Sequence, residues 1–343
     1  MNIVIFGFGI AGKYCCNILL QNRKVKNIFV IDKIKINLKN KKIKQISLKF
    51  FLEKSNEIEY AIISTPSSDH YKYAKLCLEK KINVLIEKPF TLQLKHAKKL
   101  IELSKKTKLK CWTILQNRYN LASNKMLNLT KELGLKSVSF VDCSLYWHRT
   151  KKYYSNNWRG KYSTDGGVLT NQAIHLLDML IYIFGEIKNF NVLAGYNKKK
   201  LQAEDLISIN FLHKNKIISS FKATTRANRN YEASIDVISD KKRFKIRGIS
   251  LNSFHLWKNE NFLIDRKNSE NFSSSGGQIG GMGNGHKKIL QEFLSKKNKF
   301  SSKGLEIKNN LYVLKVIHSI YNNLLSNKKS LNKITYKQSK LGI

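Results

Sequence analysis

The sequence predicts an α/β domain built on a parallel sheet, followed by an α+β domain with a large, mostly antiparallel open sheet. Over the first third of the chain, short apolar runs alternate with helical stretches, as in βαβ units. Several of these runs are apolar at consecutive positions, as expected of strands covered on both faces. From about residue 136, apolar and polar residues alternate with period two in closely spaced runs, which is typical of antiparallel strands. We expect the domains to span residues 1–117 and 118–343.

The strong positive charge suggests nucleic acid or an anionic membrane as a partner, but its makeup favours another explanation. The chain has 63 Lys and Arg residues against 23 Asp and Glu, a formal charge of +40. Only nine of the 63 are Arg, the residue that bidentate base recognition favours, and the Lys residues are scattered through every segment. Since Lys, Asn and Ile share A/T-rich codons, we interpret the excess as codon bias and expect neither nucleic acid nor membrane as a partner.

Hydropathy and cysteine usage narrow the class of protein and its expected location. A hydrophobic content of 42% with 10% aromatics is typical of a globular chain, and no apolar run reaches the roughly 18 residues that span a bilayer. The chain opens on a strand and a turn, which argues against a cleaved signal peptide. The five cysteines are odd in number and lack CxxC spacing, which argues against a disulfide framework and a zinc site. We expect no bound metal and a cytoplasmic location.

The first turn of the chain carries a glycine motif in the context that gives it meaning. The expected strands of this domain are 3–6, 28–31, 60–64, 83–86 and 110–115, and the clearest helices are 70–79 and 92–106. The motif GxGxxG follows the first strand as Gly7, Phe8, Gly9, Ile10, Ala11 and Gly12. Its glycines permit a tight turn, close approach of a pyrophosphate, and packing of helix on strand. The helix that follows offers its positive end to phosphates.

Asp32 ends the second strand, 20 residues after Gly12. A carboxylate at this place accepts hydrogen bonds from the adenosine ribose and disfavours a 2′-phosphate. Together with the glycine motif, Asp32 predicts a Rossmann domain that binds NAD. NADP is the second choice, because Lys33 and Lys35 lie beside the carboxylate and tolerate a phosphate.

The two prolines of the chain, Pro66 and Pro89, each follow the carboxyl end of a predicted parallel strand. Ligands of open α/β sheets bind at that edge. In a chain that otherwise avoids proline, we expect these two to fix loops beside the cofactor. The cofactor-binding residues predicted in these loops are Thr65, Pro66, His70, Glu87 and Lys88.

The second domain is expected to be dominated by one sheet. Its predicted strands include 137–147, 188–194, 207–211, 217–222, 234–237, 243–247 and 253–257. With helices on one face, the other face needs a cover, and subunit association supplies one. The glycine-rich stretch 273–285 is either a linker or a substrate lid.

Two motifs make the chain resemble the Gfo/Idh/MocA family of oxidoreductases. The first is Glu87-Lys88-Pro89 with Thr65-Pro66 and His70 upstream, and the second is the segment 166–178. The broad family has Asp four residues before the His of the second motif, whereas this chain has Asn171 before His175. The version Asn-Gln-Ala-Ile-His is similar to the branch that oxidises UDP-N-acetyl-2-amino-2-deoxyglucuronate at the sugar C3. The resemblance implies catalytic roles for Lys88 and His175, and a homodimer or homotetramer formed through the sheet of the second domain.

The residues themselves support a sugar site. Asn171 and His175 are spaced i, i+4 and share one helix face next to a glycine loop, where a hydroxyl can be held. Oxidation of a secondary alcohol needs a group that takes the hydroxyl proton, and Lys88 and His175 are the candidates, in an order that the sequence leaves open. A short segment also concentrates aromatics with Arg, which suits a uracil or sugar face and a diphosphate or carboxylate. The predicted substrate-binding residues are Lys88, Arg149, Tyr154, Trp158, Arg159, Asn171, Gln172 and His175.

We therefore expect an NAD-dependent dehydrogenase of a UDP-linked N-acetylated hexuronic acid, in the synthesis of a cell-surface polysaccharide precursor. The first alternative keeps the family and changes the substrate to a polyol, a free sugar or another nucleotide sugar. The second is a non-catalytic protein that binds a dinucleotide or a polyanion.

Overall fold

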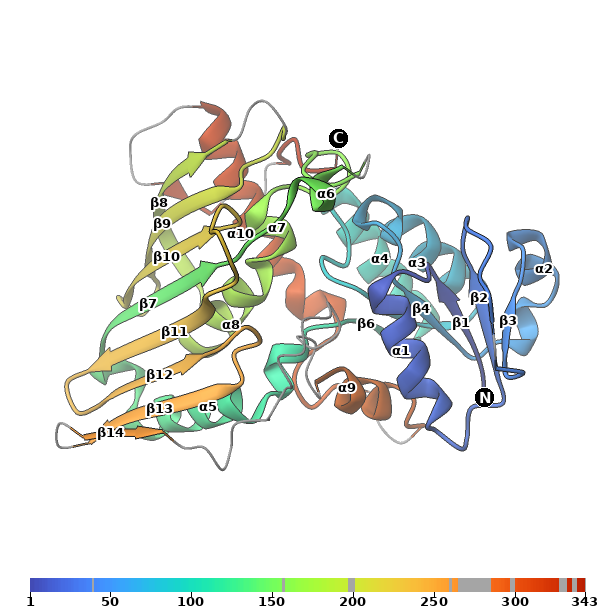
Figure 1. Cartoon of the computed structure of the whole chain (residues 1–343), viewed down its shortest axis with the longest axis horizontal. Coiled ribbons are helices and arrows are strands. Elements are labelled where there is room, and N and C mark those ends of the chain that lie inside the picture. The colour runs from blue at the N-terminus through green and yellow to red at the C-terminus, as the bar shows by residue number, and fades with distance from the viewer. Residues whose placement is uncertain are drawn as a thin grey trace. The chain divides into compact units, whose positions relative to one another are not determined.

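The computed structural model describes residues 1–38, 40–155, 158–196, 201–258, 261–264, 285–296, 300–326, 332–334 and 338–342. The chain forms two compact units, each with one sheet (Figure 1). The first unit contains Met1–Ile114 and His286–Leu311, and the second contains Leu115–Gly285 and Tyr312–Ile343.

The first unit has a parallel sheet with the strand order β3-β2-β1-β4-β5-β6, which is the order of a doubly wound dinucleotide-binding fold. Its strands are β1 (Asn2–Phe6), β2 (Asn27–Ile31), β3 (Ile43–Gln45), β4 (Tyr60–Ile63), β5 (Asn83–Ile86) and β6 (Cys111–Thr113). Its helices are α1 (Ile10–Leu20), α2 (Leu48–Glu53), α3 (His70–Glu79), α4 (Leu94–Thr107) and α9 (Gly285–Phe293). The central strands are almost fully buried because helices cover both faces, which explains their continuous apolar runs.

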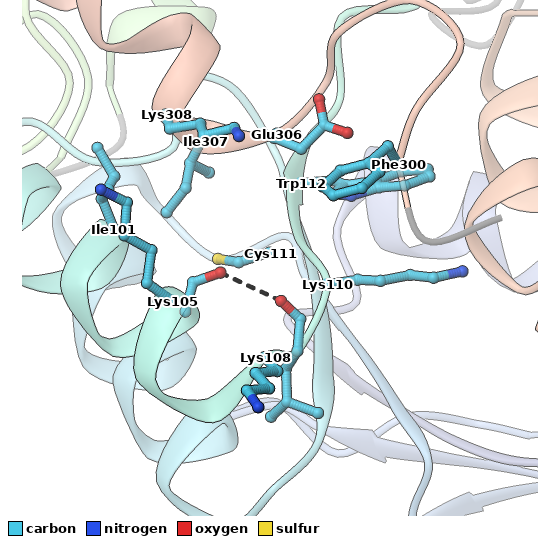
Figure 2. Close-up of a pocket in the computed structure, with 12 residues that line it drawn as sticks. Ile101, Lys105, Lys108, Lys110, Cys111, Trp112, Phe300, Glu306, Ile307 and Lys308 are labelled. Carbon is cyan, nitrogen blue, oxygen red and sulfur yellow. Dashed lines mark hydrogen bonds between the residues drawn. The ribbon is translucent and has the colours of Figure 1, made fainter.

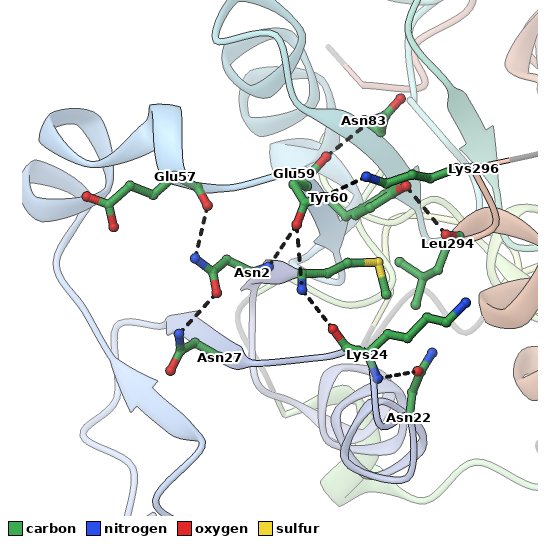
Figure 3. A network of polar contacts seen from close by, with 11 residues as sticks. Asn2, Asn22, Lys24, Asn27, Glu57, Glu59, Tyr60, Asn83, Leu294 and Lys296 are labelled. Carbon is green, nitrogen blue, oxygen red and sulfur yellow. Dashed lines mark hydrogen bonds and ion pairs between the residues drawn. The ribbon is translucent and has the colours of Figure 1, made fainter.

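Side-chain amides and a carboxylate tie the strands together at their amino ends (Figure 3). Asn27 Nδ2 donates to Asn2 Oδ1 at 3.0 Å, and the Asn2 backbone nitrogen donates to Glu59 Oε2 at 3.2 Å. Asn83 Nδ2 donates to the Glu59 carbonyl oxygen at 3.2 Å. This network closes the amino edge of the sheet and leaves the opposite, carboxyl edge to the ligand loops.

The sequence analysis found the main elements of this unit but missed two. All five expected strands and both expected helices are present, with ends shifted by up to two residues. The missed elements are β3 and α2, which are too short for a clear periodic pattern. A cap does mark the start of α2, since the Phe50 amide nitrogen donates to Ser47 Oγ at 3.1 Å.

The expected division between residues 117 and 118 differs from the two units in two respects: the units divide between Ile114 and Leu115, and His286–Leu311 packs with the first unit. The Phe293 ring contacts Tyr60 and Trp112, with ring centroids 5.4 and 5.5 Å apart. Lys110 Nζ donates to the carbonyl oxygens of Phe293 and Ser295 at 2.8 and 2.6 Å. Contacts between residues so distant in sequence leave no local pattern, so the return of the chain could not be predicted.

The second unit contains a mixed sheet with the order β14-β13-β12-β11-β7-β10-β9-β8-β15. Its strands are β7 (Val138–Tyr146), β8 (Ile187–Gly195), β9 (Leu206–His213), β10 (Ile218–Thr224), β11 (Glu232–Ser239), β12 (Arg243–Arg247), β13 (Ser253–Lys258), β14 (Asn261–Ile264) and β15 (Asn332–Lys333). Its helices are α5 (Leu121–Leu133), α6 (Lys151–Tyr154), α7 (Val168–Asn171), α8 (Ile174–Phe184) and most of α10 (Ile307–Ser326). Among the described strands of this second sheet, only β7 and β10 pair in parallel, so the expected mostly antiparallel sheet is confirmed.

The period-two pattern identified the buried face of this sheet. Ile207, Ile209 and Phe211 of β9 are buried, and the polar residues between them are exposed. Helix α8 packs on β7 and β11, and α5 packs on β12 and β13. The core of the second unit therefore lies between the sheet and these helices.

Three further findings concern the predictions about membranes, cysteines and the glycine-rich stretch. No helix in the described ranges is long and apolar enough to cross a membrane. All five cysteines are buried as free thiols. The stretch 273–285, expected to be a linker or lid, lies outside the described residues except for Gly285.

Candidate functional site

The turn after β1 is built so that only glycine fits at two of its positions. Gly7 has φ +87°, and a Cβ there would lie 2.7 Å from the Ser64 carbonyl oxygen. A Cβ on Gly12 would lie 2.2 Å from the Gly7 carbonyl oxygen. Ser64 Oγ fixes the same turn by donating to the Gly7 carbonyl oxygen at 2.7 Å. The first and third glycines of the motif thus hold helix α1 close to β1, as the motif predicts.

Gly9 has the opposite environment. A Cβ at this position would meet no atom within 4 Å, so the space above it is open, at the position that caps α1. Asp32 lies next to it and accepts hydrogen bonds from the amide nitrogens of Phe8 at 2.6 Å and Ile34 at 2.9 Å. An open cradle at a helix amino terminus, with a carboxylate beside it, fits the pyrophosphate and ribose of a dinucleotide.

His70 connects the two proline loops. Its ring is 1% exposed, with Nδ1 2.7 Å from the Pro89 carbonyl oxygen and Nε2 2.9 Å from the Thr65 carbonyl oxygen. Burial lowers the pKa of His70, against the effect of these two carbonyl oxygens. His70 was predicted as a cofactor contact, and in the structure both of its ring nitrogens contact carbonyl oxygens of the two proline loops, one of them next to Lys88.

Glu87 is held by its neighbour in the chain and by a distant histidine. Its carboxylate accepts from the Lys88 amide nitrogen at 3.2 Å and lies 3.6 Å from His286 Nε2, at the start of α9. Burial acts to raise the pKa of the Glu87 carboxyl, but His286 and Lys88 outweigh it, so the pKa lies below its ordinary value. Glu87 therefore stays ionised and orients the loop that carries Lys88.

In the second unit, a buried ion pair braces the helix that carries His175. Arg118 Nε donates to Asp178 Oδ2 at 3.0 Å, and Nη2 donates to Oδ1 at 2.5 Å. The Arg118 guanidinium is thus used within the fold. One turn earlier on α8, His175 Nε2 lies 3.4 Å from Gln116 Nε2. His175 itself is partly exposed, as a residue that acts on a ligand must be.

Several predicted substrate contacts gather around one residue that was not among them, Tyr153 of α6. The Arg159 guanidinium stacks 3.9 Å from the centroid of the Tyr153 ring, and the Arg149 guanidinium lies 5.3 Å from it. Gln172 Nε2 donates to the Tyr153 hydroxyl oxygen at 3.1 Å, and Asn171 Nδ2 does so at 3.3 Å.

The other two predicted contacts lie at the edge of this group. The Tyr154 hydroxyl bonds Thr225 Oγ1 at 2.8 Å, and burial raises the pKa of Tyr154 to about 12. The Trp158 ring lies under the Arg159 guanidinium, 4.3 Å from its centre. The structure thus brings six predicted substrate contacts of the second unit into one cluster around Tyr153: Arg149, Tyr154, Trp158, Arg159, Asn171 and Gln172. His175 contacts Gln116 instead, and Lys88 belongs to the first unit.

A buried carboxyl supports the glycine loop that precedes His175. Glu204 Oε1 accepts from the Leu169 amide nitrogen and from the Tyr321 hydroxyl, each at 3.0 Å. The same hydroxyl accepts from the Gly167 amide nitrogen at 3.1 Å. Burial raises the pKa of Glu204 to about 7.

A cavity of about 220 Å³ in the first unit holds none of the predicted site residues (Figure 2). It lies between the end of α4, β6 and the returning segment around Glu306 and Ile307. Lys105 and Lys108 line it, but lysines are favoured at a helix carboxyl end by the helix dipole alone. Among the described residues, no group of three or more His, Cys, Asp or Glu side chains could hold a metal ion.

Comparison with protein families agrees with both units. Residues 1–115 match the model of an oxidoreductase family with an NAD-binding Rossmann fold, and residues 131–245 match the Gfo/Idh/MocA carboxyl-terminal domain. The chain belongs to the Gfo/Idh/MocA oxidoreductase family. The first unit is accordingly the NAD-binding domain of this family member.

Curated relatives match over part of their length. An uncharacterized oxidoreductase YdgJ of Escherichia coli is 25% identical over 188 residues, 54% of each chain. The scyllo-inositol 2-dehydrogenase (NADP(+)) IolW of Bacillus subtilis is 24% identical over 158 residues, 46% of this chain and 42% of its own. The chain thus spans about half the length of the curated relatives it matches.

Solved structures match over nearly the whole chain. The WlbA dehydrogenase of Chromobacterium violaceum, in complex with NADH and UDP-GlcNAcA, has a TM-score of 0.83 and 20% identity, covering 98% of this chain and 96% of its own. The WlbA dehydrogenase of Bordetella pertussis, with the same two ligands, has a TM-score of 0.80 and 18% identity, covering 98% of both chains. At these identities the likeness establishes the fold.

Four residues of this Gfo/Idh/MocA member support its predicted site and were missed as contacts by the sequence analysis: Gln116, Tyr153, Glu204 and His286. Tyr153 belongs to the aromatic segment that was noticed, but its neighbour Tyr154 was chosen. His286 follows the glycine-rich stretch directly, which is the signal that could have singled it out. No local pattern marks Gln116 or Glu204, since their partners are distant in the chain.

Proposed function

We propose that the protein catalyses NAD-dependent oxidation of the C3 hydroxyl of a UDP-linked N-acetylated hexuronic acid, in the synthesis of a cell-surface polysaccharide precursor. The substrate assignment rests on one observation, the cluster of Arg149, Arg159, Tyr153 and Trp158 in the unit that also contains His175. Guanidinium groups pair with a diphosphate or carboxylate, and the rings stack on uracil or a sugar. The WlbA dehydrogenases, which were crystallised with UDP-GlcNAcA, support the same choice through their fold.

The cofactor half of the proposal rests on the first unit. Gly7, Gly9 and Gly12 leave room for the pyrophosphate of NAD at the amino end of α1, and Asp32 would accept from the ribose. The carboxylate also disfavours a 2′-phosphate, so we propose NAD rather than NADP. When bound, NAD supplies a hydride acceptor for the substrate carbon.

We assign the hydroxyl proton to Lys88 and His175. Lys88 would hold the hydroxyl and stabilise the developing alkoxide, with His175 as the base. His70 and Glu87 act indirectly, since they fix the backbone on either side of Lys88. In the second unit, the Arg118–Asp178 pair fixes the helix that presents His175.

The test is oxidation of a panel of compounds by purified protein with NAD, followed through NADH formation. The panel contains UDP-N-acetylglucosaminuronic acid, UDP-glucuronic acid, UDP-N-acetylglucosamine, free glucose and inositols. We expect turnover with the first compound and a lower kcat/KM with UDP-sugars that lack either the carboxylate or the acetamido group. Turnover of scyllo-inositol or glucose, with none of the UDP-sugars, would replace this substrate with that of a polyol or free-sugar dehydrogenase, as in the relative IolW.

We propose in addition that two copies associate through the outer face of the large sheet and work in the cytoplasm. The outer face exposes Leu206 and Ile218 next to the ion pair of Lys222 with Asp142, at 2.8 Å. Such a mixture of apolar and paired charged groups suits an interface between copies. Light scattering after gel filtration should give a dimer or tetramer, and Ile218→Lys should lower the mass toward the monomer; a wild-type monomer would contradict the association.

A further inference from the structure

The Tyr153 hydroxyl is the point on which the polar groups of the second unit converge. Three N–H donors reach its oxygen: Arg159 Nη1, Asn171 Nδ2 and Gln172 Nε2. A neutral phenol oxygen offers lone pairs for about two donors. The three donors therefore share one acceptor, and one of them can turn to an oxygen of a ligand while the others stay in place.

The donors are fixed from their other sides, so their directions are defined. Asn171 Nδ2 donates to both carboxylate oxygens of Asp165, each at 2.8 Å. Because a carboxylate only accepts, this contact establishes which end of the Asn171 amide is the NH₂ group. Gln172 is 4% exposed, and the Arg159 guanidinium lies between the rings of Tyr153 and Trp158.

Asp165 is itself part of the fold at this point. It is 3% exposed, and its Oδ2 accepts from the Gly160 amide nitrogen at 3.3 Å. Asn171 stands four residues before His175, and the Asp165 carboxylate lies one contact further away, against the Asn171 amide. The arrangement thus keeps a negative group near the site while presenting N–H donors to the ligand.

We infer that Tyr153 is a positioning residue for substrate: its hydroxyl oxygen holds the N–H donors of Arg159, Asn171 and Gln172 together, and one of these donors turns to a sugar or carboxylate oxygen of the substrate. This rests on the proposed function, since those three residues are its substrate contacts. Tyr153 acts through its hydroxyl oxygen rather than on the reacting carbon. Its removal therefore weakens substrate binding and leaves NAD binding as it is.

Tyr312 offers a matched control in the same unit. Its hydroxyl is also hydrogen-bonded, accepting from the Ile187 amide nitrogen at 2.9 Å and donating to the Ile187 carbonyl oxygen at 2.8 Å. These bonds join α10 to β8, and none of the donors around Tyr153 takes part in them. Tyr312→Phe thus removes a hydrogen-bonded tyrosine hydroxyl that joins two elements of the fold and has no part in the proposed substrate site.

The experiment compares Tyr153→Phe with Tyr312→Phe in the full chain. We measure kcat and KM for UDP-N-acetylglucosaminuronic acid, the NAD dissociation constant by calorimetry, and the midpoint of thermal unfolding. Tyr153→Phe should raise KM about tenfold, as expected for the loss of one or two hydrogen bonds to charged or polar partners, with kcat and NAD affinity changed less than about twofold. Tyr312→Phe should lower the unfolding midpoint and leave KM unchanged.

Three outcomes overturn parts of this picture separately. Equal KM values in the two variants, with active wild-type protein, overturn the positioning role of Tyr153 alone. A larger KM effect from Tyr154→Phe than from Tyr153→Phe overturns it in favour of the residue that the sequence predicted. No turnover of any UDP-sugar by the wild-type protein overturns the proposed function and, with it, this use of Tyr153.

Discussion

The candidate site residues of the two units are built from different groups. In the first unit, glycines and backbone carbonyls define the space around the turn after β1, as at Gly7, Gly9 and Gly12. In the second unit, side chains define the site by holding each other, as at Tyr153 and Glu204. A site built from backbone tolerates few residue types at a few fixed positions, whereas a site built from side chains can change its ligand by exchange of a few residues. The same fold can thus keep one cofactor and vary its substrate.

The largest expected effect is the loss of kcat on replacing Lys88 of the first unit or His175 of the second, the two residues proposed to handle the hydroxyl proton. Lys88→Ala and His175→Ala should each lower kcat by roughly 10²–10⁴-fold, the usual range for a general acid or base, with NAD affinity largely intact. If both act on one hydroxyl proton, the double variant should be little worse than either single variant. Steady-state kinetics and calorimetry with NAD measure these effects.

The matched control for Lys88 is Lys99→Ala, which removes an exposed lysine from α4 of the same unit. Wild-type rates in Lys99→Ala exclude a general effect of lost positive charge. Wild-type rates in Lys88→Ala or His175→Ala would show that the proton is handled elsewhere. Fully additive losses in the double variant would mean that the two residues act at separate steps.

The second effect is a pH dependence of stability that arises in the second unit, at Glu204. The folded protein raises the pKa of the Glu204 carboxyl from 4.5 to about 7, so the folded state binds this proton more tightly than the unfolded state. Its contribution to stability is then complete below about pH 4.5 and falls as pH rises through about 7. The loss is on the order of 3 kcal/mol. The titratable groups that face the Glu204 carboxyl are Tyr162, Tyr196, Tyr321 and Asp205. The charge of Asp205 adds to the rise in the pKa of Glu204, and Arg226 pairs with Asp205.

Glu204→Gln tests this difference. The free energy of unfolding of the variant, measured by urea denaturation from pH 4.5 to 8, should shift relative to wild type in favour of the variant as pH rises. Glu53→Gln, at an exposed carboxylate on α2 of the first unit, should leave the pH dependence unchanged. Parallel pH profiles for wild type and Glu204→Gln would mean that Glu204 is ionised in the folded protein.

The third effect compares two glycines of the first unit. We expect Gly9 to leave space for the cofactor, whereas Gly12 leaves space that the packing of the fold needs. Gly12→Ala forces a Cβ to 2.2 Å from a backbone oxygen and should cost about 1–3 kcal/mol of stability. Gly9→Ala meets no atom within 4 Å at an ordinary φ of −71°, so the unfolding midpoint should stay close to wild type. Both variants should bind NAD more weakly. Unchanged NAD affinity in Gly9→Ala would show that the pyrophosphate lies elsewhere.

This contrast explains how much the sequence could predict. Strand runs, the glycine motif and the two prolines are local in sequence, so the fold of the first unit and its cofactor turn could be predicted. The period-two alternation likewise identified the buried face of the large sheet. Contacts such as Glu87 with His286, or Glu204 with Tyr321, join residues far apart in the chain and leave no spacing to detect. Tyr153 and Tyr154 are equivalent by composition, and only the packing of α6 decides which hydroxyl faces Gln172.

The smallest effect compares two helix caps, one in each unit. Ser47 caps α2 through the Phe50 amide nitrogen at 3.1 Å, and Thr150 caps α6 through the Tyr153 amide nitrogen at 3.2 Å. Ser47→Ala and Thr150→Ala should each cost about 1 kcal/mol of stability or less. Because α6 carries Tyr153, only Thr150→Ala should also raise KM for the nucleotide sugar, by a few-fold, whereas no residue on α2 belongs to the predicted site. Equal, unchanged KM values in both variants would mean that the position of α6 is set by its aromatic and guanidinium contacts, so that the side-chain cluster holds itself together without help from the backbone.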